Sequence, residues 1–176
     1  MGLQIGFAPY PKGTVTASAK VNPSNYGMVY MVKNMQVDEQ TQPPDGRMTM
    51  VRLVKNASGS AITPGTPVKF KTGGLGYLIA GETGAESADG FSDPHVTTIA
   101  NGEWFLMAIS GPTKAQKAAG TITLGDQLST VASGQVQKIT AATPTVLQLS
   151  LMCGKAEETS SAAANTLIKI DVRNLI

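Results

Sequence analysis

The sequence contains few groups that could react. Its 176 residues include one cysteine and one histidine, Cys153 and His95, and only 15% of them are charged, against about 25% in an average protein. A single cysteine cannot form an internal disulfide, which fits a reducing compartment. One histidine and one cysteine are too few ligands for a zinc site, and the sequence has no carboxylate loop with calcium-binding spacing. We therefore expect neither a metal nor another cofactor.

Long hydrophobic runs and a basic stripe are also lacking. No apolar run approaches the ~20 residues needed to cross a bilayer, and the N-terminus lacks a basic stretch followed by an apolar block. The 14 basic and 12 acidic residues give a net charge of +2, whereas nucleic-acid-binding domains concentrate basic residues on one face. We therefore expect neither a membrane nor a nucleic acid as a partner. A neutral polar surface with little charge favours a protein that assembles with other subunits.

The first 46 residues differ from the rest of the chain. Five prolines interrupt them, and each proline removes a donor from any sheet, so only residues 28–32 are expected to form a strand. The segment also carries Phe7, Tyr10, Tyr26 and Tyr30, whereas disordered tails contain few aromatic residues. It is either a flexible leader or an extended arm that becomes ordered against another subunit. We favour the arm and expect these four aromatic residues to contact that other subunit.

Residues 47–176 are expected to form one β-domain. Short apolar stretches alternate with Gly, Ser, Asn and Asp, which is typical of short antiparallel strands. Helix is expected only at residues 114–119 and as a turn at residues 160–164, and a long loop is expected at residues 81–94. We therefore predict an all-β fold, a small antiparallel β-sandwich or barrel with an extended N-terminal arm and at most one or two short helices. The expected strands are residues 48–55, 68–71, 77–79, 104–109, 146–152 and 167–172.

Period-two alternation predicts which side chains of the last two strands face the core. The polar residues Gln148 and Ser150 alternate with leucines in the first of these strands, and Lys169 and Asp171 alternate with aliphatic residues in the second. Trp104 is also expected in the core. The predicted inward residues are Leu147, Leu149 and Leu151 in residues 146–152, and Ile168, Ile170 and Val172 in residues 167–172.

Three blocks of turn and strand residues follow one another in a distinctive order. Residues 56–68 read Asn-Ala-Ser-Gly-Ser-Ala-Ile-Thr-Pro-Gly-Thr-Pro-Val, residues 124–128 read Leu-Gly-Asp-Gln-Leu with Ser-Gly-Gln-Val at 133–136, and residues 154–159 read Gly-Lys-Ala-Glu-Glu-Thr before the closing strand. This order resembles a family of tailed-bacteriophage head decoration, or cement, proteins. The resemblance leaves out the segment before Arg47. It implies a β-domain on the outside of the capsid, commonly a trimer at a local threefold axis, with the major capsid protein as its partner.

No set of residues predicts catalysis. His95 and Cys153 could formally pair as base and nucleophile, but neither has a signature neighbourhood, and we expect a surface histidine and a buried structural cysteine. Asp126 is explained by turn capping, and the neighbours Glu157 and Glu158 are weak candidates for a hydrolytic pair. Residues 73–76, Gly-Gly-Leu-Gly, lack the Lys-Ser/Thr of a phosphate loop and are expected to form a hairpin turn.

We therefore expect a non-enzymatic structural protein of the virion. It would be assembled in the host cytoplasm and would bind the outer surface of a bacteriophage capsid, which it stabilises as a homotrimer clamping neighbouring major capsid subunits. The clamp would bury apolar area and add backbone hydrogen bonds at sheet edges. The alternative is a carbohydrate- or receptor-binding module of a phage head fibre or tail, and a third possibility is a small hydrolase.

Overall fold

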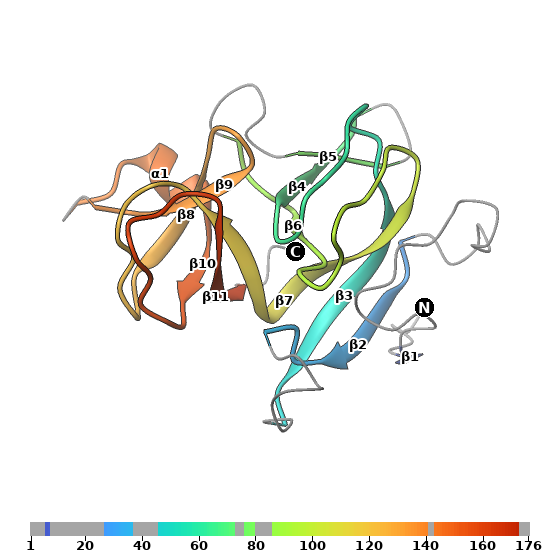
Figure 1. Cartoon of the computed structure of the whole chain (residues 1–176), viewed down its shortest axis with the longest axis horizontal. Helices are drawn as coiled ribbons and strands as arrows, with labels where there is room; N and C mark the ends of the chain where they lie inside the picture. Colours follow the sequence, from blue (N-terminus) through green and yellow to red (C-terminus); the bar gives the residue numbers. More distant parts are fainter. Residues whose placement is uncertain are drawn as a thin grey trace.

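The computed structural model describes residues 6–7, 27–36, 46–72, 76–79, 86–140 and 143–172, and they form strands with one short helix (Figure 1). The all-β fold class is therefore confirmed. In this part of the chain no helix is long and apolar enough to cross a membrane. The elements are β1 (Gly6–Phe7), β2 (Val29–Lys33), β3 (Met48–Lys55), β4 (Pro67–Phe70), β5 (Tyr77–Ile79), β6 (Gly90–Ser92), β7 (Trp104–Lys117), β8 (Gln127–Val131), β9 (Gln135–Lys138), α1 (Val146–Ser150), β10 (Met152–Ala156) and β11 (Thr166–Val172).

The C-terminal half of the chain closes into a five-stranded barrel. Its strands follow the order β7, β11, β10, β8 and β9, each antiparallel to the next. The barrel closes where β9 returns parallel to β7, with Lys117 opposite Val136. The sequence predicted an antiparallel sandwich or barrel; the structure is a barrel, and this parallel pair makes it a mixed one.

The strands that precede this barrel in the chain form another ring, in which equivalent strands are neighbours in the same order. β3, β7, β6, β4 and β5 are antiparallel neighbours, and a parallel bridge between Asn56 and Tyr77 joins β5 back to the end of β3. We call this ring the first barrel and the C-terminal ring the second barrel. β2 lies outside the first barrel, antiparallel to β3, and β1 is parallel to β2.

The two barrels are a structural repeat. Ile62-Thr63-Pro64-Gly65 enters β4 as Ile122-Thr123-Leu124-Gly125 enters β8, and Gly65 and Gly125 both have positive φ. The backbone bonds repeat as well: Ser92 N donates to Thr66 O at 2.9 Å, and Ala156 N donates to Asp126 O at 2.9 Å. β3, β4, β5, β6 and the first half of β7 thus correspond to the second half of β7, β8, β9, β10 and β11.

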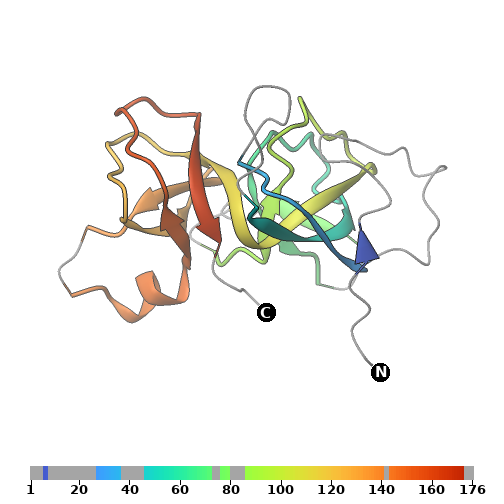
Figure 2. The same cartoon turned by 90° about the horizontal axis from the view of Figure 1, so that it is seen from below.

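The long strand β7 belongs to both barrels, which lie side by side along it (Figures 1 and 2). Ser110 is its last residue paired with β3, and Gly111 is the first paired with β11. Gly111 has φ +88°, and a Cβ there would lie 2.7 Å from the Met48 carbonyl oxygen. Glycine therefore allows the strand to turn from one barrel into the other while β3 passes close by.

Each barrel encloses an apolar core, as period-two alternation requires. Along the first half of β7, every second side chain points into the first barrel, and the side chains between them pack on the opposite face with Tyr30 of β2. The core of the first barrel comprises Val54, Ile62, Val68, Tyr77, Val96, Ile99, Phe105, Met107 and Ile109. The core of the second barrel is part of a larger hydrophobic cluster. Its members there are Ala115, Ile122, Leu128, Val136, Cys153, Ala156, Ile168, Ile170 and Val172.

Most predicted strands are present, and β11 has its predicted inward face. The predicted strand at residues 28–32 is β2, at Val29–Lys33. It precedes the domain boundary expected at Arg47 but pairs with β3 inside the fold. β4 and β5 are antiparallel, and the hairpin turn predicted between them at residues 73–76 lies, except for Gly76, outside the described residues. Within the loop predicted at 81–94, residues Gly90–Ser92 form β6.

The strand predicted at residues 146–152 is wrong, because α1 occupies Val146–Ser150. The Thr145 side chain accepts from Gln148 N, and the Gln148 side chain accepts from Thr145 N. This capping box satisfies two N–H groups at the helix start and favours helix over strand. Leu147 and Leu149 are consequently 60% and 51% exposed, and only Leu151 of the three leucines is buried.

The two predicted helical pieces are also wrong. Residues 114–117 continue β7, where the inward positions are occupied by Ala115 and Lys117. A strand forms despite the helix-favouring composition because β11 pairs along the whole segment. At residues 160–164 there is no helix, and Ser160 forms a bridge with Ile122.

Candidate functional site

Cys153 is a core residue, as predicted from the sequence. It is 1% exposed, and its Sγ lies 3.5 Å from the Leu128 carbonyl oxygen. Burial raises the pKa of its thiol to about 12, so the nucleophilic thiolate is strongly disfavoured.

His95 is half-buried, not the surface histidine that the sequence predicted. Its Nε2 donates to the backbone oxygen of Met35 at 2.8 Å, and its backbone N donates to Asp93 Oδ1 at 2.9 Å. The ring thus holds the segment after β2 against the loop after β6. This contact explains the residue without a catalytic role.

The carboxylates considered from the sequence are engaged in structural contacts. Asp126 Oδ2 accepts from Thr123 N at 2.8 Å, which is the predicted turn cap. Glu158 Oε1 accepts from Lys169 N at 2.7 Å, and Glu157 binds Arg47. Across the described ranges, no group of three His, Cys, Asp or Glu residues could hold a metal.

Of the four aromatic residues predicted as contacts, the structure describes the side chain of Tyr30 alone. Tyr30 is 5% exposed and belongs to the core of its own domain, next to Val51 of β3. Phe7 is in β1, but its side chain lies outside the description, as do Tyr10 and Tyr26. Their contact with a partner stays a prediction.

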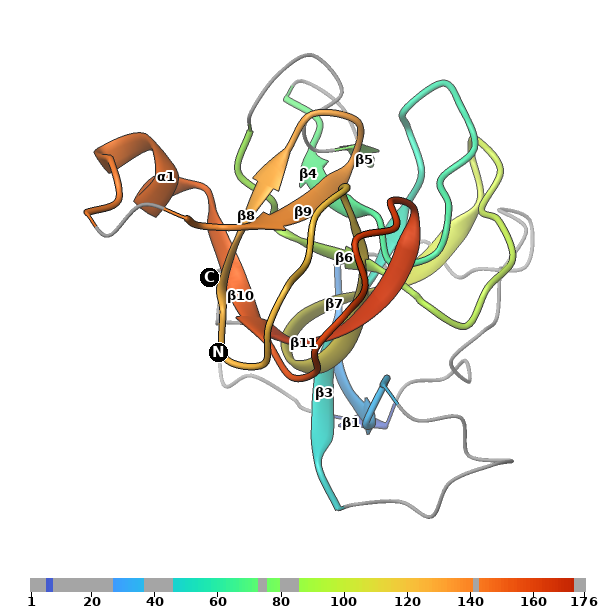
Figure 3. The same cartoon turned by 60° about the vertical axis from the view of Figure 1, so that its left-hand side comes forward.

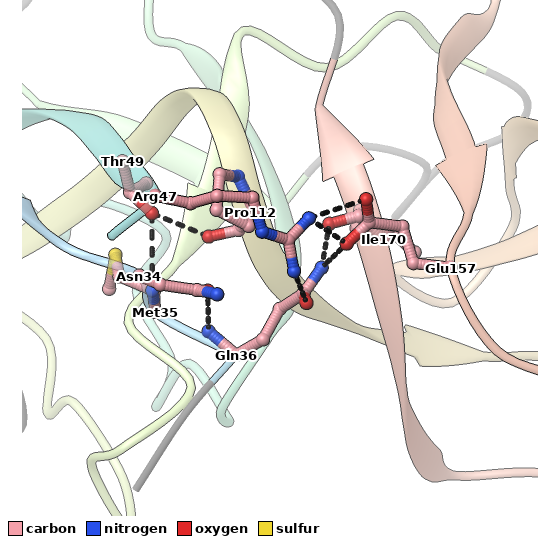
Figure 4. Close-up of polar contacts among 8 residues, drawn as sticks. All are labelled: Asn34, Met35, Gln36, Arg47, Thr49, Pro112, Glu157 and Ile170. Carbon is pink, nitrogen blue, oxygen red and sulfur yellow. Dashed lines mark hydrogen bonds and ion pairs between the residues drawn. The ribbon is translucent and has the colours of Figure 1, made fainter. Parts of the chain in front are cut away.

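A network of polar contacts lies where residues 34–36 meet both barrels (Figure 4). We call Gln36, Arg47 and Glu157 the Gln36 cluster. Gln36 is 3% exposed, and its Nε2 donates to Ile170 O of β11 at 2.8 Å and to Glu157 Oε2. Arg47 Nη1 donates to both oxygens of Glu157, at 2.7 and 2.8 Å, and Nη2 donates to Gln36 Oε1 at 3.0 Å. The cluster thus fastens the chain around β2 to the second barrel.

The backbone next to Gln36 is fastened at the junction of the barrels. Met35 N donates to Pro112 O at 3.2 Å and lies 3.1 Å from Thr49 Oγ1. Asn34 Oδ1 accepts from Gln36 N at 2.8 Å. Residues 34–36 therefore connect β3, the bend in β7 and β11.

A surface groove of about 460 Å³ adjoins the Gln36 cluster. Three basic residues line it, Arg47, Lys155 and Lys169, with the acidic residues Glu157 and Asp171. The exposed Leu124 stands at its edge. Mixed charges, backbone and an apolar side chain suit contact with another protein segment better than a chemical step.

The sequence analysis missed both the Gln36 cluster and the repeat. Gln36 and Glu157 are far apart in the chain, and no sequence pattern around either residue predicts that the two are in contact. The repeat did leave a signal, because Ile62-Thr63 with Gly65 matches Ile122-Thr123 with Gly125. Ile62, Thr63 and Gly65 lie in the first block of the family resemblance, and Gly125 lies in the second.

Comparison with known proteins finds a distant structural likeness. No protein-family model matches the sequence, and no curated protein matches it. Among solved structures, the chain is similar to the head fiber gp8.5 N base of bacteriophage phi29, with 16% sequence identity and a TM-score of 0.48 over 71% of this chain and 96% of that one. This likeness is too distant to assign a fold or a function.

Proposed function

We propose that this chain is a non-enzymatic structural protein of a tailed-bacteriophage head, which binds the outer surface of the capsid and stabilises it as a homotrimer. The order of the three sequence blocks carries the proposal, through their resemblance to head decoration proteins. The positions of the reactive groups are consistent with it: Cys153 is buried and protonated, and His95 and Glu157 make structural contacts.

The proposed mechanism is mechanical. We expect two barrels that share β7 to resist deformation, so that the body can carry load between capsid subunits. The N-terminal arm would bind the partner protein, with Phe7, Tyr10 and Tyr26 as aromatic anchors of the kind that dominate interfaces. Ordering an extended segment costs conformational entropy, so burial of these side chains against the major capsid protein or a neighbouring subunit must offset it. Trimerisation would strengthen the modest single contacts through effective concentration.

A carbohydrate- or receptor-binding module of a head fibre or tail is the second candidate. The groove beside the Gln36 cluster favours it, because its basic and acidic side chains could hydrogen-bond a polar ligand. A sugar-stacking platform, however, needs exposed aromatic rings, and Phe70 is the one exposed aromatic residue among the described side chains. Binding to host-surface glycans that is lost in Arg47→Ala would support this candidate over the first.

The deciding experiment measures binding to capsids that lack the protein. Deletion of residues 1–26 removes β1 and three of the predicted anchors but keeps β2, Tyr30 and the Gln36 cluster. We expect the thermal transition to stay nearly unchanged and capsid affinity to fall at least about tenfold, which corresponds to about 1.4 kcal/mol of binding free energy.

Two further measurements complete the test. A full-length control with Phe7→Ser, Tyr10→Ser and Tyr26→Ser should reproduce the loss if aromatic anchors carry it. In purified virions, quantitative mass spectrometry should find many copies per particle. A truncated chain that decorates capsids as tightly as the full one would reduce the arm to a leader, and a full chain that binds no capsids would reject the proposed function.

A further inference from the structure

One side of the second barrel carries more basic than acidic residues. β10, β11 and the second half of β7 lie next to one another there (Figure 3). Because side chains alternate along a strand, the residues between the core positions face outward. The four basic and two acidic residues leave an excess of two positive charges, as large as the net charge of the whole chain. We call these outward residues, with the Arg47 that binds Glu157, the charged face: Arg47, Lys114, Lys155, Glu157, Lys169 and Asp171.

Two of the lysines of this face have no ionic partner. Both oxygens of Glu157 accept from Arg47, and one of them also accepts from Gln36. Asp171 is directly opposite Lys155 in the register of β10 and β11. Even so, no described residue forms an ion pair or a hydrogen bond with the ammonium group of Lys155 or of Lys169. Both lysines line the groove of about 460 Å³, which therefore offers two cationic groups to a partner.

Lys169 also lies next to another lysine. In the register of β11 and β7, Lys169 is directly opposite Lys114, so the two side chains are on the same face of the sheet. Like charges at directly opposite positions repel each other and destabilise a sheet. A bound anion would relieve this repulsion. The strand register thus favours an anionic partner independently of the groove.

The rest of the groove selects among anions. Arg47, whose guanidinium could bind a phosphate through two hydrogen bonds, is already bound to Glu157. Glu157 and Asp171 would repel the closely spaced charges of a nucleic-acid backbone. Leu124, 64% exposed at the edge of the groove, needs an apolar neighbour to be covered. A protein segment can supply both a carboxylate for the lysines and an aliphatic side chain for Leu124.

The matching turn of the first barrel shows how such a segment would lie. Gly65 O accepts from Gln116 N at 2.9 Å, and a Cβ on Gly65 would lie 2.6 Å from Leu167 Cδ2. A strand and an aliphatic side chain therefore cover that turn. Gly125, at the matching turn of the second barrel, lines the groove, and among the described atoms a Cβ there would meet only Lys155 Cε, at 3.7 Å. An extended segment thus has room to approach the backbone at Gly125.

We propose that this groove binds an extended acidic segment of another protein, with an aspartate or glutamate held by Lys155 and Lys169 and an aliphatic residue against Leu124. The two lysines are diagonal neighbours across β10 and β11, a spacing of about 7–8 Å that long side chains can bridge. Ammonium–carboxylate hydrogen bonds are stronger than neutral ones. The inference rests on the proposed function and deepens it: the segment belongs to the major capsid protein, and the groove is a second capsid contact beside the N-terminal arm.

Binding to capsids that lack the protein tests the groove. Lys155→Glu and Lys169→Glu reverse its two free charges, and Lys71→Glu makes the same change at an exposed lysine after β4, on the first barrel. We expect each groove variant to lower capsid affinity at least about tenfold and to weaken its dependence on salt. Lys71→Glu should bind like the unaltered chain. The thermal midpoint shows whether each variant is folded, and Lys155→Gln or Lys169→Gln replaces one that is not.

Cross-linking identifies the group that the lysines bind. A carbodiimide activates a carboxylate, and a lysine amine in contact with it then forms an amide and releases the reagent as a urea. Mass spectrometry of capsid-bound chain should find such links from Lys155 or Lys169 to an aspartate or glutamate of the major capsid protein. A chain with both Lys155→Arg and Lys169→Arg keeps the charges but lacks the amines, so it should bind capsids without forming these links.

The outcomes separate this inference from the proposed function. Groove variants that bind capsids as tightly as Lys71→Glu, or capsid-bound chain that forms no link from either lysine, would overturn the inference and leave the capsid function standing. Binding of duplex DNA that Lys155→Glu abolishes would assign the groove to a nucleic acid and overturn it as well. An unaltered chain that binds no capsids would reject the proposed function, and the capsid segment as partner with it.

Discussion

Lys117 is a charged side chain enclosed at the closing point of the second barrel. It is 0% exposed, and its Nζ donates to the backbone oxygens of Ala118, Gly120 and Ala163 at 3.0, 2.9 and 2.6 Å. Burial lowers the pKa of its amine. In the first barrel, Asn56 stands at the corresponding bridge, and its Nδ2 donates to Ser60 O and Ile99 O. Each barrel thus uses one buried polar side chain to bind the loop carbonyls where the parallel strand returns.

Replacing Lys117 by methionine should destabilise the fold although it keeps the length of the side chain. Three carbonyl oxygens lose their donor, and each buried unsatisfied group costs about 1–3 kcal/mol where water cannot replace the donor. We expect a loss of at least about 2 kcal/mol in unfolding free energy, measured by urea denaturation. The same change at the exposed Lys155 should cost below about 0.5 kcal/mol. Equal losses at both positions would show that the three bonds contribute nothing.

The buried thiol of Cys153 predicts a pH dependence of reactivity and stability. With a folded pKa of about 12 and an ordinary value of 9.0, the stability contribution is fully present below pH 9 and is lost as the pH rises toward 12. At pH 8.5 the native chain should resist iodoacetamide, and the unfolded chain should react. Mass spectrometry with and without denaturant measures the difference, and rapid labelling of the native chain would contradict the assigned burial.

The members of the Gln36 cluster should differ in their effect on stability. Gln36→Ala leaves the buried Ile170 oxygen without this donor and should cost about 1–3 kcal/mol. Arg47 and Glu157 have side chains 45% and 26% exposed, so Arg47→Ala should cost under about 1 kcal/mol because solvent screens the pair. Urea denaturation of the two variants tests this order. A larger loss of stability for Arg47→Ala than for Gln36→Ala would show that Arg47, and not Gln36, contributes most to the cluster.

At the scale of elements, α1 shows how a cap can decide between two structures. Residues 146–151 alternate as a strand would, yet Thr145 and Gln148 cap a helix of five residues. The helix leaves Leu149 in solvent and places Leu151, 7% exposed, at the start of β10. Of the three leucines that alternation predicted to face inward, Leu151 alone is buried.

Two leucine substitutions separate these alternatives. Leu151→Ala should open a cavity and cost about 2–5 kcal/mol, and Leu149→Ala should cost below about 0.5 kcal/mol. Urea denaturation at a protein concentration low enough to keep the chain monomeric measures both values. A strand with both leucines inward would give equal costs.

At the scale of the whole molecule, the two barrels share one strand and cannot be separated as domains. The 14 residues of β7 contribute to both cores, and the segment at residues 34–36 joins β3, β7 and β11. Loss of either barrel would expose one half of β7 and unpair it from its neighbours. We therefore expect the two barrels to fold as a single unit.

Unfolding should accordingly occur in one cooperative transition. Differential scanning calorimetry should give a calorimetric enthalpy equal to the van't Hoff enthalpy. The Lys117→Met variant should lower the single midpoint without splitting the transition. Two resolved transitions would show that the barrels unfold separately despite the shared strand.

The sequence by itself determined the class of the fold, most of its strands and the inward face of β11. These follow from local alternation and turn residues, which act over a few neighbouring positions. It also identified Cys153 and Trp104 as core residues and Asp126 as a turn cap. Local sequence patterns gave the wrong structure where tertiary contacts opposed them. At residues 114–117 the composition predicted helix, but pairing with β11 makes the segment a strand.

Only the tertiary structure decided how the strands close and which distant residues meet. Barrel closure depends on β9 reaching Lys117 and on β5 reaching Asn56, and strand alternation carries no record of such pairings. Gln36 and Glu157 meet because the bend at Gly111 carries β7 from one barrel into the other. The repeat left a short sequence signal, but this signal does not show that the turn at Gly65 packs on the second barrel while Leu124 at the matching turn stays exposed. A sequence fixes local geometry through local sterics, whereas closure and the faces left open are set by long-range packing.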